Sequence, residues 1–111
     1  MPEQRPVAAA HLAERGQIDH ATLTTGFIGT PMLCPALSEY GYNEYAYALL
    51  LQTRCPSWLY EVSMGATTTW ERWNSVRPDG SFGPVEMNSL NHYAFGAICE
   101  WIYKDVAGIR P

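Results

Sequence analysis

The sequence predicts an all-α protein built from helical hairpins, and three observations favour this class. Stretches in which apolar and polar residues alternate, as in strands, are almost absent. Capping residues, prolines and glycines stand where helices would begin and end. The last apolar segment keeps intervals of three and four residues without a miss, which makes one helical face core: Leu90, Tyr93, Ala94, Ala97, Ile98, Trp101, Ile102 and Val106.

The first predicted helix is short and rich in alanine. Pro6 suits a first helical turn, the helix runs from Val7 to Arg15, and Gly16 stops it. A connection over residues 17–25 follows.

The second predicted helix begins after a loop, Gly26-Phe27-Ile28-Gly29, whose glycines suggest a close approach of the backbone. Thr30 is expected to cap this helix and Pro31 to open it, while Pro35 should kink it or delay its start. Tyr40-Gly41 ends it.

A third helix should run from Glu44 to Gln52 with Asn43 as its cap, antiparallel to the second because the link between them is short. Trp58 to Met64 is the next predicted helix, closed by Gly65. After a long loop that contains the turn Arg77-Pro78-Asp79-Gly80, the last segment is expected to be one helix.

That last helix should be the longest. Asn88 or Ser89 is expected to cap it, and it should reach about Ala107, with Gly108 beyond its end. Glu100 and Lys104 would form an i, i+4 pair.

The length and charge of the chain limit the number of domains and the classes of partner that we expect. With 111 residues the chain, residues 1–111, is a single domain or a piece of one. A net charge of −4 argues against nucleic acid, because no basic stripe is available to neutralise phosphates. No apolar run approaches the ~20 residues of a membrane span, and the first residues lack the apolar region of a signal peptide.

Cysteines and aromatic residues indicate compartment and assembly. Cys34, Cys55 and Cys99 are an odd number spread far apart, which favours buried free thiols in a reducing compartment and a cytoplasmic protein. Four Trp, seven Tyr and three Phe are more aromatic surface than so short a chain should hide. We therefore expect a homo-oligomer or packing against the remainder of a larger barrel.

The candidate site is the stretch Trp70-Glu71-Arg72-Trp73, where a carboxylate stands between two indoles. Indole rings beside a carboxylate suit a sugar, whose C–H face packs on the ring while its hydroxyls need acceptors. An alternative of about equal weight is a buried Trp pair with Glu71 and Arg72 turned to solvent.

A second group of polar residues is expected at the start of the last helix, with His92 one turn from both Asn88 and Gly96. A helical histidine is more often structural than functional, so both roles stay open. Helical hairpins place their junctions at one end, which would bring His92, Glu71 and the loop 26–29 into one basin. The chain lacks a metal-ligand cluster, a nucleotide loop and a nucleophile–base pairing, so no cofactor and no metal are expected.

Four blocks of sequence resemble consecutive blocks of the bacterial α-L-rhamnosidases, in order and at natural spacing over nearly the whole chain. They are Leu23-Thr24-Thr25-Gly26-Phe27-Ile28-Gly29-Thr30-Pro31, Pro56-Ser57-Trp58-Leu59-Tyr60, the run from Gly65 through Trp70-Glu71-Arg72-Trp73 to Phe82, and Met87-Asn88-Ser89-Leu90-Asn91-His92-Tyr93-Ala94-Phe95-Gly96. The resemblance is to the closing part of that family's catalytic (α/α)6 barrel.

This resemblance implies an inverting glycosidase that removes terminal α-L-rhamnose from a glycan or glycoside. It implies that Glu71 is the general base, that His92 binds the rhamnose, and that Trp70 and Trp73 lie at or near the sugar pocket. The family's acidic motif that supplies the general acid does not occur in this chain. The alternatives to an enzyme segment are a non-catalytic carbohydrate-binding module and a self-associating helical module.

Overall fold

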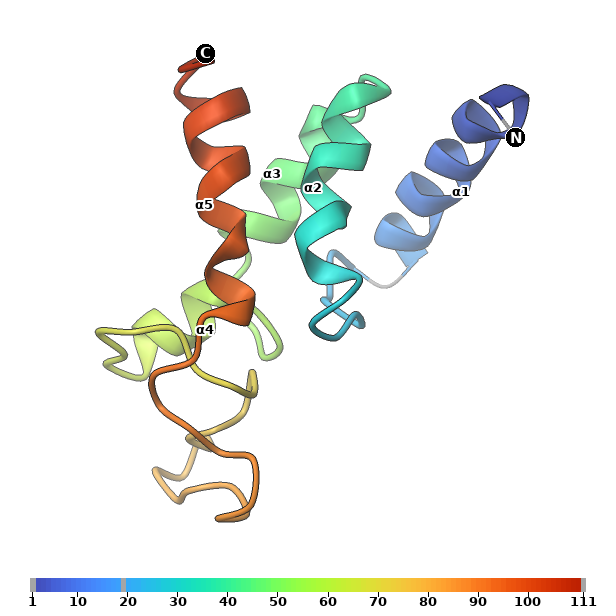
Figure 1. Ribbon diagram of the computed structural model, residues 1–111. Coiled ribbons are helices and arrows are strands. Elements are labelled where there is room, and N and C mark those ends of the chain that lie inside the picture. Colours follow the sequence, from blue (N-terminus) through green and yellow to red (C-terminus); the bar gives the residue numbers. More distant parts are fainter. Residues whose placement is uncertain (1, 19, 111) are drawn as a thin grey trace.

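The computed structural model describes residues 2–18 and 20–110, and it is helical, as predicted (Figure 1). The described residues contain no β-strand, only an isolated antiparallel bridge between Val76 and Phe82. The elements are η1 (Pro2–Gln4), α1 (Arg5–Ile18), α2 (Thr30–Glu39), α3 (Asn43–Leu51), α4 (Trp58–Ser63), η2 (Ala94–Ala97), α5 (Ile98–Trp101) and η3 (Ile102–Val106).

The long helices lie beside one another, and the link between α2 and α3 lies at the upper end of the array (Figure 1). Helix α2 packs against α1, α3 and α5, and α3 also contacts α4. The loop that precedes α2 and the long segment between α4 and η2 both lie at the lower end in that view. The buried core between the helices comprises Ala13, Leu23, Cys34, Leu37, Ala46, Leu49, Trp58, Ile98 and Trp101.

Several helix ends agree with the sequence prediction and two caps differ by one residue. Ser57 caps α4, its hydroxyl accepting the Tyr60 backbone N–H at 3.0 Å, and Gly65 follows α4 with φ +87°. Thr30 is the first residue of α2 and not its cap, and Asn43 is likewise the first residue of α3. The Thr30 hydroxyl instead bonds the Thr25 hydroxyl at 2.8 Å, which ties the start of α2 to the preceding loop.

The last helical segment begins at Ala94, so the prediction of a helix from Asn88 or Ser89 is wrong. Residues 88–92 precede the helix and form backbone hydrogen bonds with residues 69–71. The Glu71 N–H donates to the Ser89 carbonyl at 2.9 Å, and the His92 N–H donates to the Thr69 carbonyl at 2.9 Å. These tertiary hydrogen bonds use backbone groups that would have bonded within the helix if residues 88–92 were helical.

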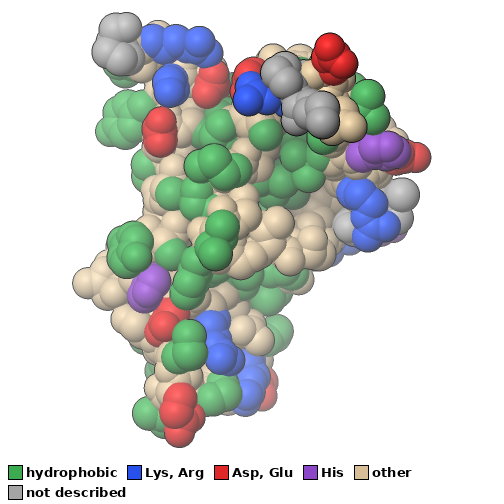
Figure 2. All heavy atoms as spheres, turned by 45° about the vertical axis from the view of Figure 1, so that its right-hand side comes forward, with side chains coloured by type: hydrophobic (Ala, Val, Ile, Leu, Met, Phe, Trp, Pro, Cys, Tyr) green, Lys and Arg blue, Asp and Glu red, His purple; other side chains and the backbone are tan. Residues whose placement is uncertain are grey.

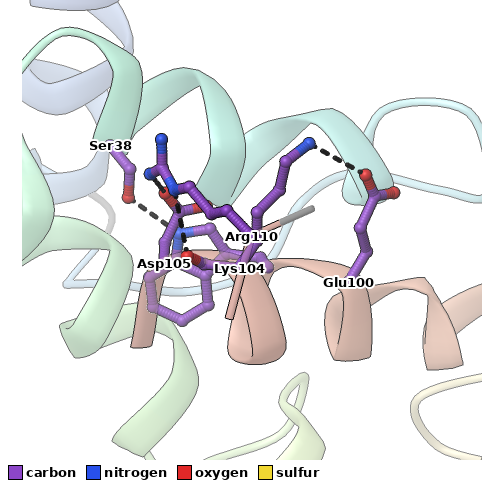
Figure 3. Close-up of polar contacts among 6 residues, drawn as sticks. Ser38, Glu100, Lys104, Asp105 and Arg110 are labelled. Atoms are coloured by element: carbon purple, nitrogen blue, oxygen red, sulfur yellow. Dashed lines mark hydrogen bonds and ion pairs between the residues drawn. The ribbon is translucent and has the colours of Figure 1, made fainter. Parts of the chain in front are cut away.

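Polar contacts hold the C-terminal helical segment to α2 and to itself (Figure 3). The indole N–H of Trp101 donates to the Ser38 hydroxyl at 2.7 Å. Lys104 and Glu100 form the predicted i, i+4 pair at 3.4 Å, and Arg110 pairs with the Asp105 carboxylate beyond them.

The three cysteines are free, but the prediction that all three are buried is wrong. Cys34 is buried among the helices, where burial raises the pKa of its thiol to about 12, while Cys55 and Cys99 are exposed. The reducing, cytoplasmic location expected from them stays a prediction.

Much apolar surface is exposed in this chain. Figure 2 shows hydrophobic side chains over the middle of one face, with charged side chains gathered mainly nearer its edges. The most exposed large apolar residues are Ile28, Val85 and Tyr93. Within the described part of the chain, no helix is long and apolar enough to cross a membrane.

Candidate functional site

A pocket of about 450 Å³ opens at the end of the helical array where the loops meet. Three segments far apart in the sequence line it, together with the ring of Phe95: residues 25–27, residues 55–56 and residues 71–74. The loop between α1 and α2 and the stretch around Glu71 therefore share one basin, as the hairpin arrangement predicted.

Glu71 lies on the wall of this pocket, half-buried. One carboxylate oxygen, Oε2, accepts the backbone N–H of Ser89 at 2.8 Å, while the Glu71 N–H donates to the Ser89 carbonyl at 2.9 Å. This two-point contact fixes the backbone and one oxygen of the side chain. The other oxygen, Oε1, accepts no hydrogen bond from the described residues, so it is free to take a proton or a ligand hydroxyl.

The two tryptophans beside Glu71 occupy different environments. Trp73 lines the pocket, stacks on Phe95 with ring centroids 3.8 Å apart, and meets the edge of Trp58 at 5.3 Å. Its indole N–H is buried and has no partner among the described residues. Trp70 is only 4 % exposed and does not line the pocket. Trp73 therefore offers an aromatic wall, and sugar contact by Trp70 stays a prediction.

His92 does not line the pocket but stacks on a ring that does. Its imidazole stacks on Phe27 at 5.0 Å and on Tyr93 at 5.0 Å, and Phe27 in turn lines the pocket. Nδ1 accepts the backbone N–H of Ala94 at 3.3 Å, which leaves Nε2 available to a ligand.

His92 is held beside the site by different contacts from those that the sequence predicted. The predicted helical face with Asn88, His92 and Gly96 in register does not exist, because residues 88–92 precede the helix. Asn88 instead reaches the Ser75 carbonyl with its side-chain amide at 3.3 Å. Pairing with Thr69 is what brings His92 to the side of the site.

Sequence reasoning missed Glu61, which is the one buried carboxyl among the described residues. Burial raises the pKa of Glu61 to about 7, while a hydrogen bond from the Trp70 N–H acts to lower it. Glu61 stands between Tyr60 and Val62 on a short helix, and nothing in that spacing distinguishes an inward from an outward carboxylate.

The pocket contains a single carboxylate among its described lining residues. Glu71 is the carboxylate among the lining residues that the structure describes. Asp79 belongs to an exposed turn, where hydrogen bonds from the Ser81 side chain and backbone lower the pKa of its carboxyl. No group of three metal-ligating side chains occurs among the described residues.

The chain matches the model of the bacterial α-L-rhamnosidase six-hairpin glycosidase domain over residues 1–106. The chain belongs to this family. The resemblance drawn from the four sequence blocks is thereby confirmed, as is the all-α hairpin class.

Relatives of this chain are α-L-rhamnosidases of bacteria and a fungus. It is 49% identical over 107 residues to an α-L-rhamnosidase of Streptomyces avermitilis, covering 96% of this chain and 10% of that protein. It is 47% identical over 109 residues to one of Formosa agariphila, covering 98% and 12%. The chain thus spans about a tenth of the length of the curated relatives that it matches.

Solved structures show the same fold over the whole chain. The crystal structure of the Streptomyces avermitilis enzyme complexed with L-rhamnose aligns with a TM-score of 0.94 at 47% identity, over 100% of this chain and 11% of that one. The α-L-rhamnosidase of Aspergillus terreus aligns with a TM-score of 0.94 at 43% identity, over 100% and 13%. The described helices therefore form a segment of a six-hairpin glycosidase domain.

Proposed function

We propose that this chain supplies the base-bearing segment of an inverting glycoside hydrolase that cleaves terminal α-L-rhamnose. The observation that carries the proposal is Glu71, a half-buried carboxylate on the wall of a pocket of about 450 Å³. Membership of the family supports the reaction class. The complex of the Streptomyces avermitilis relative with L-rhamnose supports the sugar.

Glu71 would act as the general base toward a water molecule. The Ser89 N–H fixes Oε2 at 2.8 Å, so the carboxylate has a set orientation before substrate arrives. Oε1 then removes a proton from the water that attacks the anomeric carbon. Positioned acid–base catalysis of this kind contributes ~10²–10⁴-fold.

The rest of the site would bind the sugar. Trp73, backed by Phe95, offers a flat apolar surface to the C–H face of the ring. His92 would donate to a rhamnose hydroxyl through its Nε2–H, because Nδ1 already accepts the Ala94 N–H. Trp70 would lie near the sugar pocket, next in the chain to Glu71 on its wall.

The general acid must come from outside the described residues. Inversion requires two carboxyl groups ~6.5–9.5 Å apart, with room for water beside one of them. Among the described residues that line the pocket, Glu71 is the only one with a carboxyl group. We therefore propose that the acid is contributed by the remainder of a six-hairpin barrel.

A chimera tests the proposal. Residues 1–106 would replace the matching segment of the Streptomyces avermitilis enzyme, and hydrolysis of an aryl α-L-rhamnoside would be followed by NMR. The expected first product is β-L-rhamnose. Glu71→Gln should lower kcat by at least about 100-fold while L-rhamnose still binds, because the amide keeps the shape and removes the basicity.

Glu86→Gln, in an exposed loop away from the pocket, is the matched control and should keep the wild-type kcat. A chimera that binds L-rhamnose without hydrolysis would favour the carbohydrate-binding alternative. A Glu71→Gln chimera with the wild-type kcat would overturn the assignment of the base.

A further inference from the structure

The carboxyl group of Glu61 lies directly behind the segment that carries Glu71. Glu61 is 3 % exposed, and its Oε2 accepts the Trp70 backbone N–H at 3.2 Å. Trp70 precedes Glu71 in the chain, so this bond holds the peptide unit between Thr69 and Trp70, one residue before the proposed base. The backbone carbonyl of Glu61 also accepts the N–H of Ala66 at 3.0 Å, which anchors the start of the same loop.

The segment 69–71 is thus held from two sides. On one side, Thr69 and Glu71 pair with residues 89–92 through backbone hydrogen bonds of 2.9 Å. On the other side, the contact is the Glu61 carboxyl. Loss of that acceptor would leave a buried Trp70 N–H unpaired, which favours a shift of the loop.

The second oxygen of Glu61 is an unusual feature for a helix that packs into a core. Oε1 is buried and has no hydrogen-bond partner among the described residues. A hollow of about 270 Å³ adjoins it, whose other lining side chains carry no charge: Trp58, Val62, Ala66, Thr67, Thr68 and Thr69. The charge of Glu61 acts on a titratable neighbour, the Cys55 thiol. Burial is the larger cause that raises the pKa of this thiol, and the negative charge of Glu61 raises it further. An apolar side chain would fill this place at a lower cost in free energy, so packing alone does not explain the carboxyl.

We propose that Glu61 is a positioning residue for Glu71, acting through its hydrogen bond to the Trp70 N–H. This inference rests on the proposed role of Glu71 as general base. A base displaced by about 1 Å costs on the order of 10²-fold in rate, whereas contacts that bind the sugar elsewhere in the pocket would remain.

The test uses the chimeric enzyme with two substitutions of similar volume. Glu61→Leu removes the acceptor, so kcat for an aryl α-L-rhamnoside should fall by about 10–100-fold with KM within about twofold. Glu61→Gln keeps an amide oxygen for the Trp70 N–H and should restore most of kcat. Glu100→Leu, an exposed glutamate on α5, is the control and should match wild type.

A double-mutant cycle separates positioning from a merely structural role. In the Glu71→Gln background there is no base left to position, so Glu61→Leu should have no further effect on kcat. An equal fall in both backgrounds would show that Glu61 acts independently of Glu71 and would overturn the inference. The inference also fails if Glu61→Gln is as impaired as Glu61→Leu.

Folding and the base assignment are checked separately. Glu61→Met offers a second removal of the acceptor with a flexible side chain, in case the leucine variant melts far below wild type. If Glu71→Gln alone keeps the wild-type kcat, the proposed function fails, and this inference falls with it. If Glu71→Gln is inactive but Glu61→Leu and Glu61→Met keep full kcat, only the inference on Glu61 is overturned.

Discussion

Ionisation of Glu61 should weaken the fold as pH rises through neutrality. Burial raises its pKa from 4.5 to about 7. A group whose pKa is raised on folding holds its proton more tightly in the folded state. Its contribution to stability is therefore fully present below about pH 4.5 and is lost as pH rises through about 7. At about 1.4 kcal/mol per pKa unit, the loss is on the order of 3 kcal/mol.

Thermal unfolding of the chain and of its Glu61→Gln variant measures this loss. At one fixed protein concentration, circular dichroism would give the midpoint of each from pH 4.5 to pH 8. The difference between wild type and variant cancels the other titrating groups, and it should change by on the order of 10 °C across that range, in the direction that disfavours wild type at high pH. Glu100→Gln, on an exposed ion pair with Lys104, should give a difference that is small and nearly flat. A flat difference for Glu61→Gln as well would show that the Glu61 carboxyl does not ionise at the expense of the folded state.

Three further outcomes are expected. The isolated chain should release no product from an aryl α-L-rhamnoside at an enzymatic rate, since a base without its acid loses ~10²–10⁴-fold and the positioning of the sugar besides, as a chromogenic assay would show. It should also self-associate at micromolar concentration because apolar side chains such as Ile28 and Val85 are exposed, and sedimentation of a compact monomer would contradict this. In the chimera, His92→Ala should lower kcat/KM by weakening contacts to the sugar hydroxyls while the base keeps its pH dependence, which steady-state kinetics would test.

The sequence was sufficient for the hairpin class and for most helix positions. The start of α4 at Trp58, Gly65 after its end and the Glu100–Lys104 pair follow from local rules, and the structure has each of them. Local chemistry decides these features, because each is settled within a turn or two of helix.

The start of the last helix could not be predicted from the residues around it alone. Leu90 and Tyr93 fall at helical spacing with the residues that follow, yet Leu90 is exposed and Tyr93 is 87 % exposed. Pairing of residues 89–92 with residues 69–71 overrides that periodicity, and this contact joins segments about twenty residues apart in sequence.

The site could be predicted only in part, because some of its features depend on tertiary packing. A carboxylate between two indoles marked Glu71, and its place on the pocket wall agrees with that signal. The different burial of Trp70 and Trp73 depends on what packs against each ring, as does the burial of Glu61. Such facts belong to tertiary structure and leave no trace in residue spacing.

Chemical rescue tests most directly whether Glu71 is the general base. Glu71→Gly in the chimera removes the carboxylate and leaves space on the pocket wall, into which azide can enter and attack the anomeric carbon without needing a base. We expect Glu71→Gly to be inactive in buffer, and azide to restore turnover with β-L-rhamnosyl azide as the product. Substantial hydrolysis without azide, or rescue that yields the α-azide, would contradict the assignment of Glu71 as the general base of an inverting reaction.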